Sequence, residues 1–198
     1  MDKDFYRDLI KPYGRYKSKN DLKNLCYKAL IDSFGRVKRI QGINGFNENK
    51  IRDRFIIDLD QNNELIKHAL KYDLIILIPE SYDALKRKRS DIRVKISHCC
   101  ELIFECKKLS SAEGRYLTDG LIRFILLDCA EGEDEAGMTG FIFNANIPVK
   151  LKEKVDKFYC VRLINKPVFG YPDSFQSIHK RKNSTEILIT HLFFLFNS

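Results

Sequence analysis

The sequence predicts an α/β fold in which helices flank a mixed central sheet. Three observations support this class. Segments with apolar residues at helical spacing occur along the same chain as short runs that are apolar or alternate between apolar and polar residues. Their order is helix, helix, three strands, helix, strand, helix, strand, which is typical of a layered α/β architecture. The chain has 198 residues, 44% of them hydrophobic and 31% charged, an ordinary globular balance.

The N-terminal part predicts two helical segments. Residues 19–36 form the first, and Gly35 is a plausible stop signal. Its apolar positions follow helical spacing: Leu22, Leu25, Cys26, Ala29, Leu30 and Phe34. Asn47 is suited to cap a second helix over residues 48–72, with a break near Asn62 and Asn63.

Three strands follow. Residues 73–81 are an apolar run that contains Pro79, and residues 82–90 read as a charged link. Residues 91–97 alternate between polar and apolar side chains, which predicts a half-buried strand. Residues 101–109 form the third strand after a short turn.

The C-terminal half predicts two helices and two strands. The helices cover residues 118–130 and 149–159, and an acidic turn lies at residues 132–137. The strands cover residues 138–145 and 186–196.

The length fits either one continuous domain or an N-terminal helical segment, residues 1–44, followed by a domain of residues 45–198. The first residues are charged throughout and contain no secretory signal, so a cytoplasmic location is expected. Residues 186–196 are too short to span a bilayer, so no membrane association is expected. The six cysteines show neither a CxxC pair nor zinc-finger spacing, which favours reduced thiols.

The net charge of +8 suits a polyanionic partner such as nucleic acid, although many basic proteins bind none. Two basic clusters agree with this expectation: Lys86, Arg87, Lys88 and Arg89 directly precede Ser90 and Asp91, and a second cluster runs from His179 to Lys182. Lys108, in the strand of residues 101–109, and Arg123, in the helix predicted over residues 118–130, are two further basic candidates. Each of these residues is a candidate contact for a phosphate backbone.

Three charged residues mark the candidate site. Glu105 and Lys107 are two positions apart in a strand, so their side chains point to the same face. If residues 91–97 and 101–109 pair as a hairpin, Asp91 lies opposite the end of the second strand, beside Glu105. Two buried carboxylates this close require a neutralising cation. Oxygen ligands without His or Cys favour Mg²⁺ or Mn²⁺.

The segment from Ser90 to Leu109 resembles the PD-(D/E)xK superfamily of restriction-endonuclease-like nucleases. In that family an acid begins the second core strand and E-x-K ends the third; the preceding proline is replaced here by Ser90. The resemblance implies a restriction-endonuclease-like core, metal ligation by Asp91 and Glu105, and a catalytic role for Lys107. Glu48 matches the family's helical Glu as a further ligand. The resemblance further implies metal-dependent hydrolysis of phosphodiester bonds. DNA is the favoured substrate, and defence or repair are plausible settings.

Several alternatives remain open from the sequence. Asp91, Glu105 and Lys107 also suit a structural ion-pair network. The chain also suits an inactive nucleic-acid-binding module of the same fold, or a non-enzymatic interaction subunit. For Arg123 the choices are a phosphate contact, a carboxylate partner within the site, or an ion pair on a helix face. Arg115 and Tyr116 are further candidates for substrate contact, and residues 186–196 are a candidate edge strand for homodimerisation.

Overall fold

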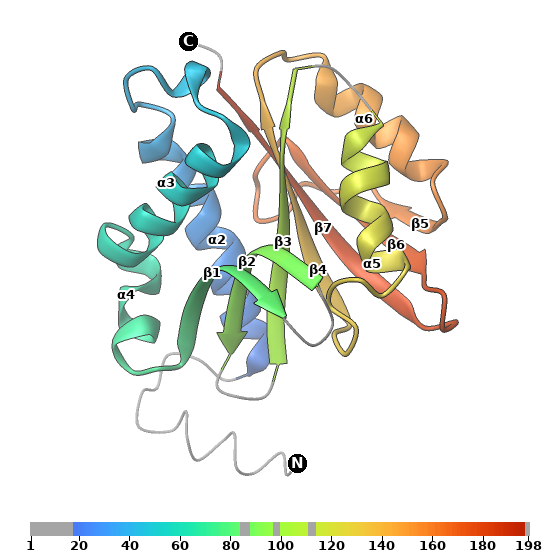
Figure 1. Ribbon diagram of the computed structural model, residues 1–198, viewed down its shortest axis with the longest axis horizontal. Coiled ribbons are helices and arrows are strands. Elements are labelled where there is room, and N and C mark those ends of the chain that lie inside the picture. Colours follow the sequence, from blue (N-terminus) through green and yellow to red (C-terminus); the bar gives the residue numbers. More distant parts are fainter. Residues whose placement is uncertain (1–17, 84–87, 97–99, 111–113, 197–198) are drawn as a thin grey trace.

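A seven-stranded mixed sheet forms the centre of the protein (Figure 1). This computed structural model describes residues 18–83, 88–96, 100–110 and 114–196. The strands are β1 (Ile75–Asp83), β2 (Lys88–Ile96), β3 (Cys100–Leu109), β4 (Glu135–Ile142), β5 (Cys160–Ile164), β6 (Ser174–Lys180) and β7 (Glu186–Leu195). Their order is β1-β2-β3-β4-β7-β6-β5. The pairs β3–β4 and β4–β7 are parallel, and the other neighbours are antiparallel. The predicted α/β class with a mixed, helix-flanked sheet is confirmed.

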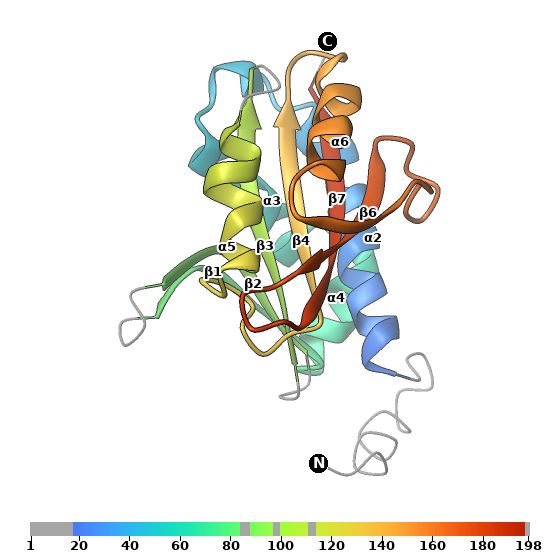
Figure 2. The ribbon, with the colours of Figure 1, turned by 90° about the vertical axis from the view of Figure 1, so that its right-hand side faces the viewer.

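Helices cover both faces of this sheet (Figures 1 and 2). On one face lie α2 (Lys19–Val37), α3 (Glu48–Gln61) and α4 (Glu64–Lys71), with the 3-10 turn η2 (Ile43–Gly45) between α2 and α3. On the other face lie the π-helix η3 (Tyr116–Leu121), α5 (Ile122–Ile125) and α6 (Ile147–Asp156). Each face therefore has its own apolar core.

Strand β3 serves both cores because its side chains alternate between the faces. Leu102, Phe104 and Cys106 belong to the core under α2 and α3. Ile103 and Leu109 belong to the core under η3 and α5. Residues 105 and 107 share the latter parity, so Glu105 and Lys107 occupy an otherwise apolar face.

The helices that lead to the site begin at side-chain caps, one of which, Asn47, was predicted. Ser18 accepts a hydrogen bond from the N–H of Asp21 at the start of α2, and Asn47 accepts one from Lys50 at the start of α3. The predicted break at Asn62 and Asn63 is confirmed, since α3 ends at Gln61 and α4 begins at Glu64. Asn63 is buried because its amide donates to α2, at the carbonyl of Ala29 and the hydroxyl of Ser33.

Strands β5 and β6 were not predicted. β5 is short and half-exposed, so it lacks an apolar signal. β6 contains the polar residues Ser177 and His179, so its sequence does not look like that of a buried strand, although both side chains are fully buried. A polar side chain can occupy a core only where it has hydrogen-bond partners, and a single sequence does not display those partners.

A chain of hydrogen bonds satisfies the buried polar groups of β6 and β7. His179 Nδ1 lies 3.2 Å from the carbonyl oxygen of Tyr159 and must therefore donate. His179 Nε2 then accepts from the Ser177 hydroxyl at 2.7 Å, and Ser177 accepts from His191 Nε2 at 2.7 Å. His191 Nδ1 accepts from the Tyr116 hydroxyl at 2.9 Å. Burial lowers the pKa of His179 to about 4 and that of His191 well below its ordinary value.

Several segment boundaries differ from their predictions, and three of the segments illustrate how. The charged link predicted over residues 82–90 is too long, because β1 continues to Asp83 and β2 begins at Lys88. The acidic turn over residues 132–137 is too long as well, because β4 begins at Glu135, whose carboxylate lies 3.6 Å from the buried ammonium of Lys23. The helix predicted over residues 118–130 is instead η3 followed by the short α5.

Strand β7 lies inside the sheet, between β4 and β6. Both of its hydrogen-bonding edges are therefore occupied, and the idea that residues 186–196 provide a free edge for homodimerisation is wrong. Among the helices that the structure describes, none combines the length and apolar composition needed to cross a membrane.

Candidate active site

Where the β2–β3 ladder ends, two side-chain carboxylates accept hydrogen bonds from backbone N–H groups of β3. The β2–β3 ladder extends as far as Phe104, and beyond that point β2 pairs with β1 alone. Asp91 Oδ2 accepts a hydrogen bond from the N–H of Cys106 at 2.7 Å. Glu48 Oε2, from the start of α3, accepts one from the N–H of Lys108 at 2.8 Å. Backbone N–H groups inside a protein need acceptors, so these bonds hold both carboxylates against β3.

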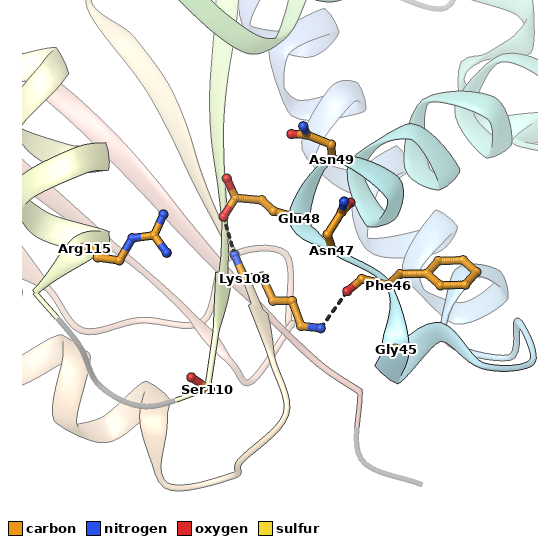
Figure 3. A pocket seen from close by; sticks show the side chains of 8 residues that line it. All are labelled: Gly45, Phe46, Asn47, Glu48, Asn49, Lys108, Ser110 and Arg115. Carbon is orange, nitrogen blue, oxygen red and sulfur yellow. Dashed lines mark hydrogen bonds between the residues drawn. The ribbon is translucent and has the colours of Figure 1, made fainter.

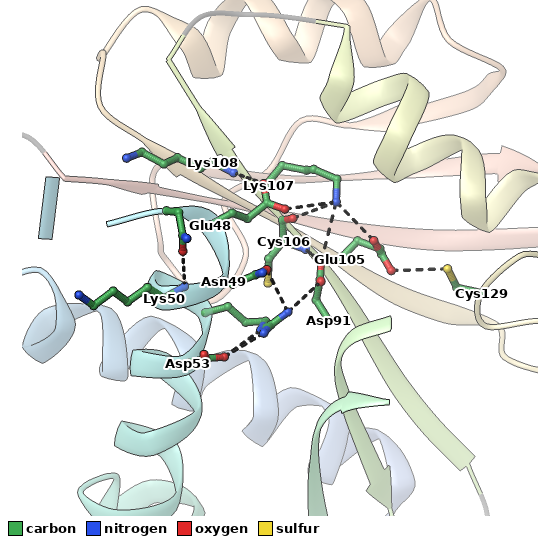
Figure 4. A network of polar contacts seen from close by, with 12 residues as sticks. Glu48, Asn49, Lys50, Asp53, Asp91, Glu105, Cys106, Lys107, Lys108 and Cys129 are labelled. Carbon is green, nitrogen blue, oxygen red and sulfur yellow. Dashed lines mark hydrogen bonds and ion pairs between the residues drawn. The ribbon is translucent and has the colours of Figure 1, made fainter. Parts of the chain in front are cut away.

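Lys107 lies at the centre of the cluster (Figure 4). Its Nζ atom is 3.5 Å from Glu105 Oε2, 3.8 Å from Asp91 Oδ2 and 3.9 Å from Glu48 Oε1. It also donates to the carbonyl oxygen of Cys106 at 3.0 Å. The expected convergence of Asp91, Glu105 and Lys107 is confirmed, and Glu48 joins them from a helix.

Glu105 is the most deeply buried of the three acids, with an exposed fraction of 0%. Arg123 Nη1 lies 2.6 Å from its Oε2 atom, and the Cys129 thiol donates to Oε1 at 3.6 Å. Burial, reinforced by the negative charge of Asp91, raises the pKa of Glu105 to about 7 although Arg123 and Lys107 act in the opposite direction. Glu105 is therefore the carboxylate that a further cation would stabilise most.

Arg52 is a part of the site that the sequence reasoning missed. Its side chain is 3% exposed, and its Nη1 atom lies 3.3 Å from Asp91 Oδ1. Arg52 also pairs with Asp53 at 2.9 Å. Its position one helical turn after Glu48 places both side chains on one face of α3, and that spacing is the signal that could have identified it.

The structure assigns specific partners to some of the predicted basic residues. Arg123 is a carboxylate partner within the site, through Glu105. The ammonium of Lys108 donates to the carbonyl oxygens of Asn44 and Phe46, so it ties the loop before α3 to β3. Tyr116 is fully buried, which excludes the substrate contact considered for it.

The basic cluster before Asp91 is described in part. Lys86 and Arg87 lie outside the described residues. Lys88 and Arg89 belong to β2, where they pair with Asp83 and Tyr82 of β1. The backbone at these two positions is therefore a strand and not the loop that the sequence predicted.

A cavity of about 590 Å³ lies beside the cluster, on the side of Glu48 (Figure 3). The loop before α3 forms one wall and the end of β3 another, and Arg115 faces them. The lining residues are Gly45, Phe46, Asn47, Glu48, Asn49, Lys108, Ser110 and Arg115. Most of these lining residues have polar or charged side chains, which suit a hydrated, charged ligand.

The atoms that surround the Lys107 ammonium are of the kind that bind a hard cation. Carboxylate oxygens of Glu48, Asp91 and Glu105 and the carbonyl oxygen of Cys106 form an all-oxygen environment, which Mg²⁺ prefers. Within the described residues, however, no group of three or more His, Cys, Asp or Glu side chains has the spacing of a metal site. The three acids therefore surround the Lys107 ammonium, but they are not spaced as direct ligands of one metal ion.

Comparisons with protein-family models, with curated proteins and with solved structures find no match for this chain. The resemblance to PD-(D/E)xK nucleases therefore remains an expectation based on Asp91, Glu105 and Lys107. Any functional argument must come from the geometry of the site.

Proposed function

We propose that this protein is a metal-dependent nuclease that hydrolyses phosphodiester bonds, with DNA as its substrate. The observation that supports this most is the convergence of three carboxylates, from α3, β2 and β3, on one lysine ammonium. Such clusters are costly unless a cation neutralises them, and active sites are where proteins commonly retain them. The net charge of +8 agrees with a polyanionic substrate.

In this proposal Asp91, Glu105 and Glu48 would hold Mg²⁺ or Mn²⁺. A metal bound there would polarise a phosphoryl oxygen and help to activate water. The ammonium of Lys107, already within 4 Å of all three acids, orients the attacking water and offsets negative charge that develops on the phosphate. Arg123 holds the Glu105 carboxylate in place through its 2.6 Å contact.

The test is incubation with plasmid and linear DNA, with and without Mg²⁺ or Mn²⁺. We expect metal-dependent cleavage by the natural protein and a loss of about a hundredfold or more in Lys107→Ala and Asp91→Asn. Lys150→Ala, at an exposed lysine in α6, is the matched control and should cleave normally. Cleavage by Lys107→Ala at the rate of the control would remove the proposal.

A specific observation also favours a second candidate, a non-catalytic ion-pair network in a nucleic-acid-binding or interaction protein. Arg52, Lys107 and Arg123 already pair with Asp91, Glu48 and Glu105. Under this alternative, Mn²⁺ would leave the melting temperature unchanged and no substrate would be cut. Salt-sensitive DNA binding that persists in Asp91→Asn would then identify a binding module.

A further inference from the structure

Three cations gather around Phe46, in the loop that leads into α3. The ammonium of Lys50 lies 4.0 Å from the centre of the Phe46 ring and the guanidinium of Arg54 lies 5.9 Å from it, at the distances of cation–π contacts. The ammonium of Lys108 approaches the same residue from β3 and donates to its carbonyl oxygen at 2.6 Å. Phe46, Lys50, Arg54 and Lys108 therefore form one patch, the Phe46 surface, which joins α3 to the end of β3.

No carboxylate among the described residues lies within ion-pair distance of these three cations. On α3, Asp53 pairs with Arg52 instead, and Glu48 accepts a hydrogen bond from the backbone of β3. Lys50 and Arg54 are four positions apart on the helix, and two like charges at this spacing destabilise a helix. The protein therefore keeps an unfavourable group of positive charges here, which a negatively charged partner would stabilise.

The Phe46 surface borders the acidic cluster at the most exposed of its three acids. The side chain of Glu48 is 27% exposed, whereas that of Glu105 is 0% exposed. Lys108 connects the two regions, because its N–H bonds to Glu48 and its ammonium bonds to Phe46. Figure 4 shows the side chains of Lys50 and Lys108 extending to the same side, away from Glu105. A polyanion on the Phe46 surface therefore reaches the cluster at Glu48.

From this arrangement we infer that the Phe46 surface binds the phosphate backbone of nucleic acid beside the acidic cluster. A chain of phosphates can pair with several cations at once, which a single small anion cannot. The choice of DNA rests on the proposed function; Lys50 and Arg54 are the contacts that the Phe46 surface adds to it. They hold the phosphates that flank the one at the cluster. Contacts of this kind position a nucleic acid without reading its bases, so the binding does not depend on sequence.

The first experiment measures DNA binding without turnover, with Ca²⁺ in place of Mg²⁺. A labelled duplex of about 20 base pairs is titrated by fluorescence anisotropy at several concentrations of NaCl. The double variant Lys50→Gln, Arg54→Gln should bind about tenfold more weakly and lower the slope of log K against log [NaCl] by about 2, because it loses two phosphate contacts. Lys150→Gln, Lys154→Gln removes the same charge from an equally spaced pair on α6, over the other face of the sheet, and is the matched control.

Lys50→Gln alone changes an exposed position and should lower the slope by about 1, so it decides the question if the double variant does not fold. Equal weakening by the double variant and its control would show that only net charge matters, and would overturn the inference. Inorganic phosphate, at the ionic strength of the NaCl buffer, should change the affinity for DNA by less than about twofold. Displacement of DNA by low millimolar phosphate would instead identify a site for a single phosphate ion and overturn the inference.

The second experiment separates the Phe46 surface from the nuclease proposal. For cleavage of the same duplex in Mn²⁺, we expect a KM about tenfold higher in Lys50→Gln, Arg54→Gln than in the control, because contacts made equally by substrate and transition state act on binding. If no DNA is cut by the natural protein, the nuclease proposal fails and the binding experiment still decides the surface. Cleavage with KM and Kd unchanged in the double variant overturns the surface and leaves the nuclease proposal intact. Binding to anionic lipid vesicles without binding to DNA would assign the surface to a membrane and also overturn the inference.

Discussion

The Arg123 guanidinium lies 2.6 Å from the Glu105 carboxylate, across eighteen positions of sequence. Glu105 comes from the middle of the sheet and Arg123 from the short helix α5 that covers it. Because Glu105 is fully buried, this contact and that of Lys107 determine whether the carboxylate can remain ionised. The contact also attaches α5 to β3 at the candidate site.

Replacing Arg123 should therefore destabilise the protein in a pH-dependent way. We expect Arg123→Leu to lower the free energy of unfolding by about 2–3 kcal/mol at pH 8, because it leaves a buried charge without its closest partner. The loss should be smaller at pH 5.5, where Glu105 is protonated, since its pKa is about 7. Urea denaturation at both pH values measures this difference. Arg123→Lys should recover part of the stability, and a loss that is equal at both pH values would contradict the reasoning.

Glu105 itself should make the metal-free protein less stable as the pH rises. Its pKa is raised from 4.5 to about 7 on folding, so its contribution is fully favourable below pH 4.5 and is lost as the pH rises through 7. Glu105→Gln removes this titration. We expect the variant to gain stability relative to the natural protein between pH 5 and pH 8, by about 3 kcal/mol at most. Parallel unfolding curves in EDTA across this range would show whether the difference changes with pH; a constant difference would refute the assignment.

Lys107 should compete with a divalent cation for the centre of the acidic cluster. Its ammonium lies within 4 Å of all three carboxylates, in the space that a shared cation would need. Lys107→Met should therefore bind Mn²⁺ more tightly, by about tenfold or more, while it abolishes cleavage. Titration calorimetry measures the affinity independently of activity. Weaker Mn²⁺ binding in Lys107→Met than in Lys150→Met would show that the lysine supports metal binding instead.

The buried histidines of β6 and β7 should make the fold sensitive to acid. Folding lowers the pKa of His179 to about 4 and that of His191 further below its ordinary 6.5. The unfolded chain therefore takes up protons first, so stability is complete above pH 6.5 and is lost as the pH falls toward 4. His179→Gln should flatten the decline in melting temperature between pH 7 and pH 4.5. His68→Gln, in the partly buried α4 position, is the control; identical declines in both variants would contradict the prediction.

Local patterns were sufficient for much of the fold. A single sequence displays the cap Asn47, the helix break at Asn62 and Asn63, the helix over residues 19–36 and the alternation of residues 91–97, because each depends on near neighbours. The hairpin that brings Asp91 beside Glu105 was also predictable, because short connections favour antiparallel neighbours. β5 and β6 were not, since Ser177 and His179 are polar residues whose partners lie far away in the chain.

The sequence by itself determined the fold class, the positions of most helices and strands, and the shared face of Glu105 and Lys107. These features follow from the helical and strand periods, which act over a few residues. Tertiary structure alone decided that Arg52 joins these side chains and that Arg123 is a carboxylate partner within the site. The bond from Lys108 to Glu48 spans sixty positions, and the contact between Arg52 and Asp91 joins a helix to a strand. Such contacts depend on the packing of α3 and α5 against β3, because the distance between remote side chains is set by packing and not by local pattern.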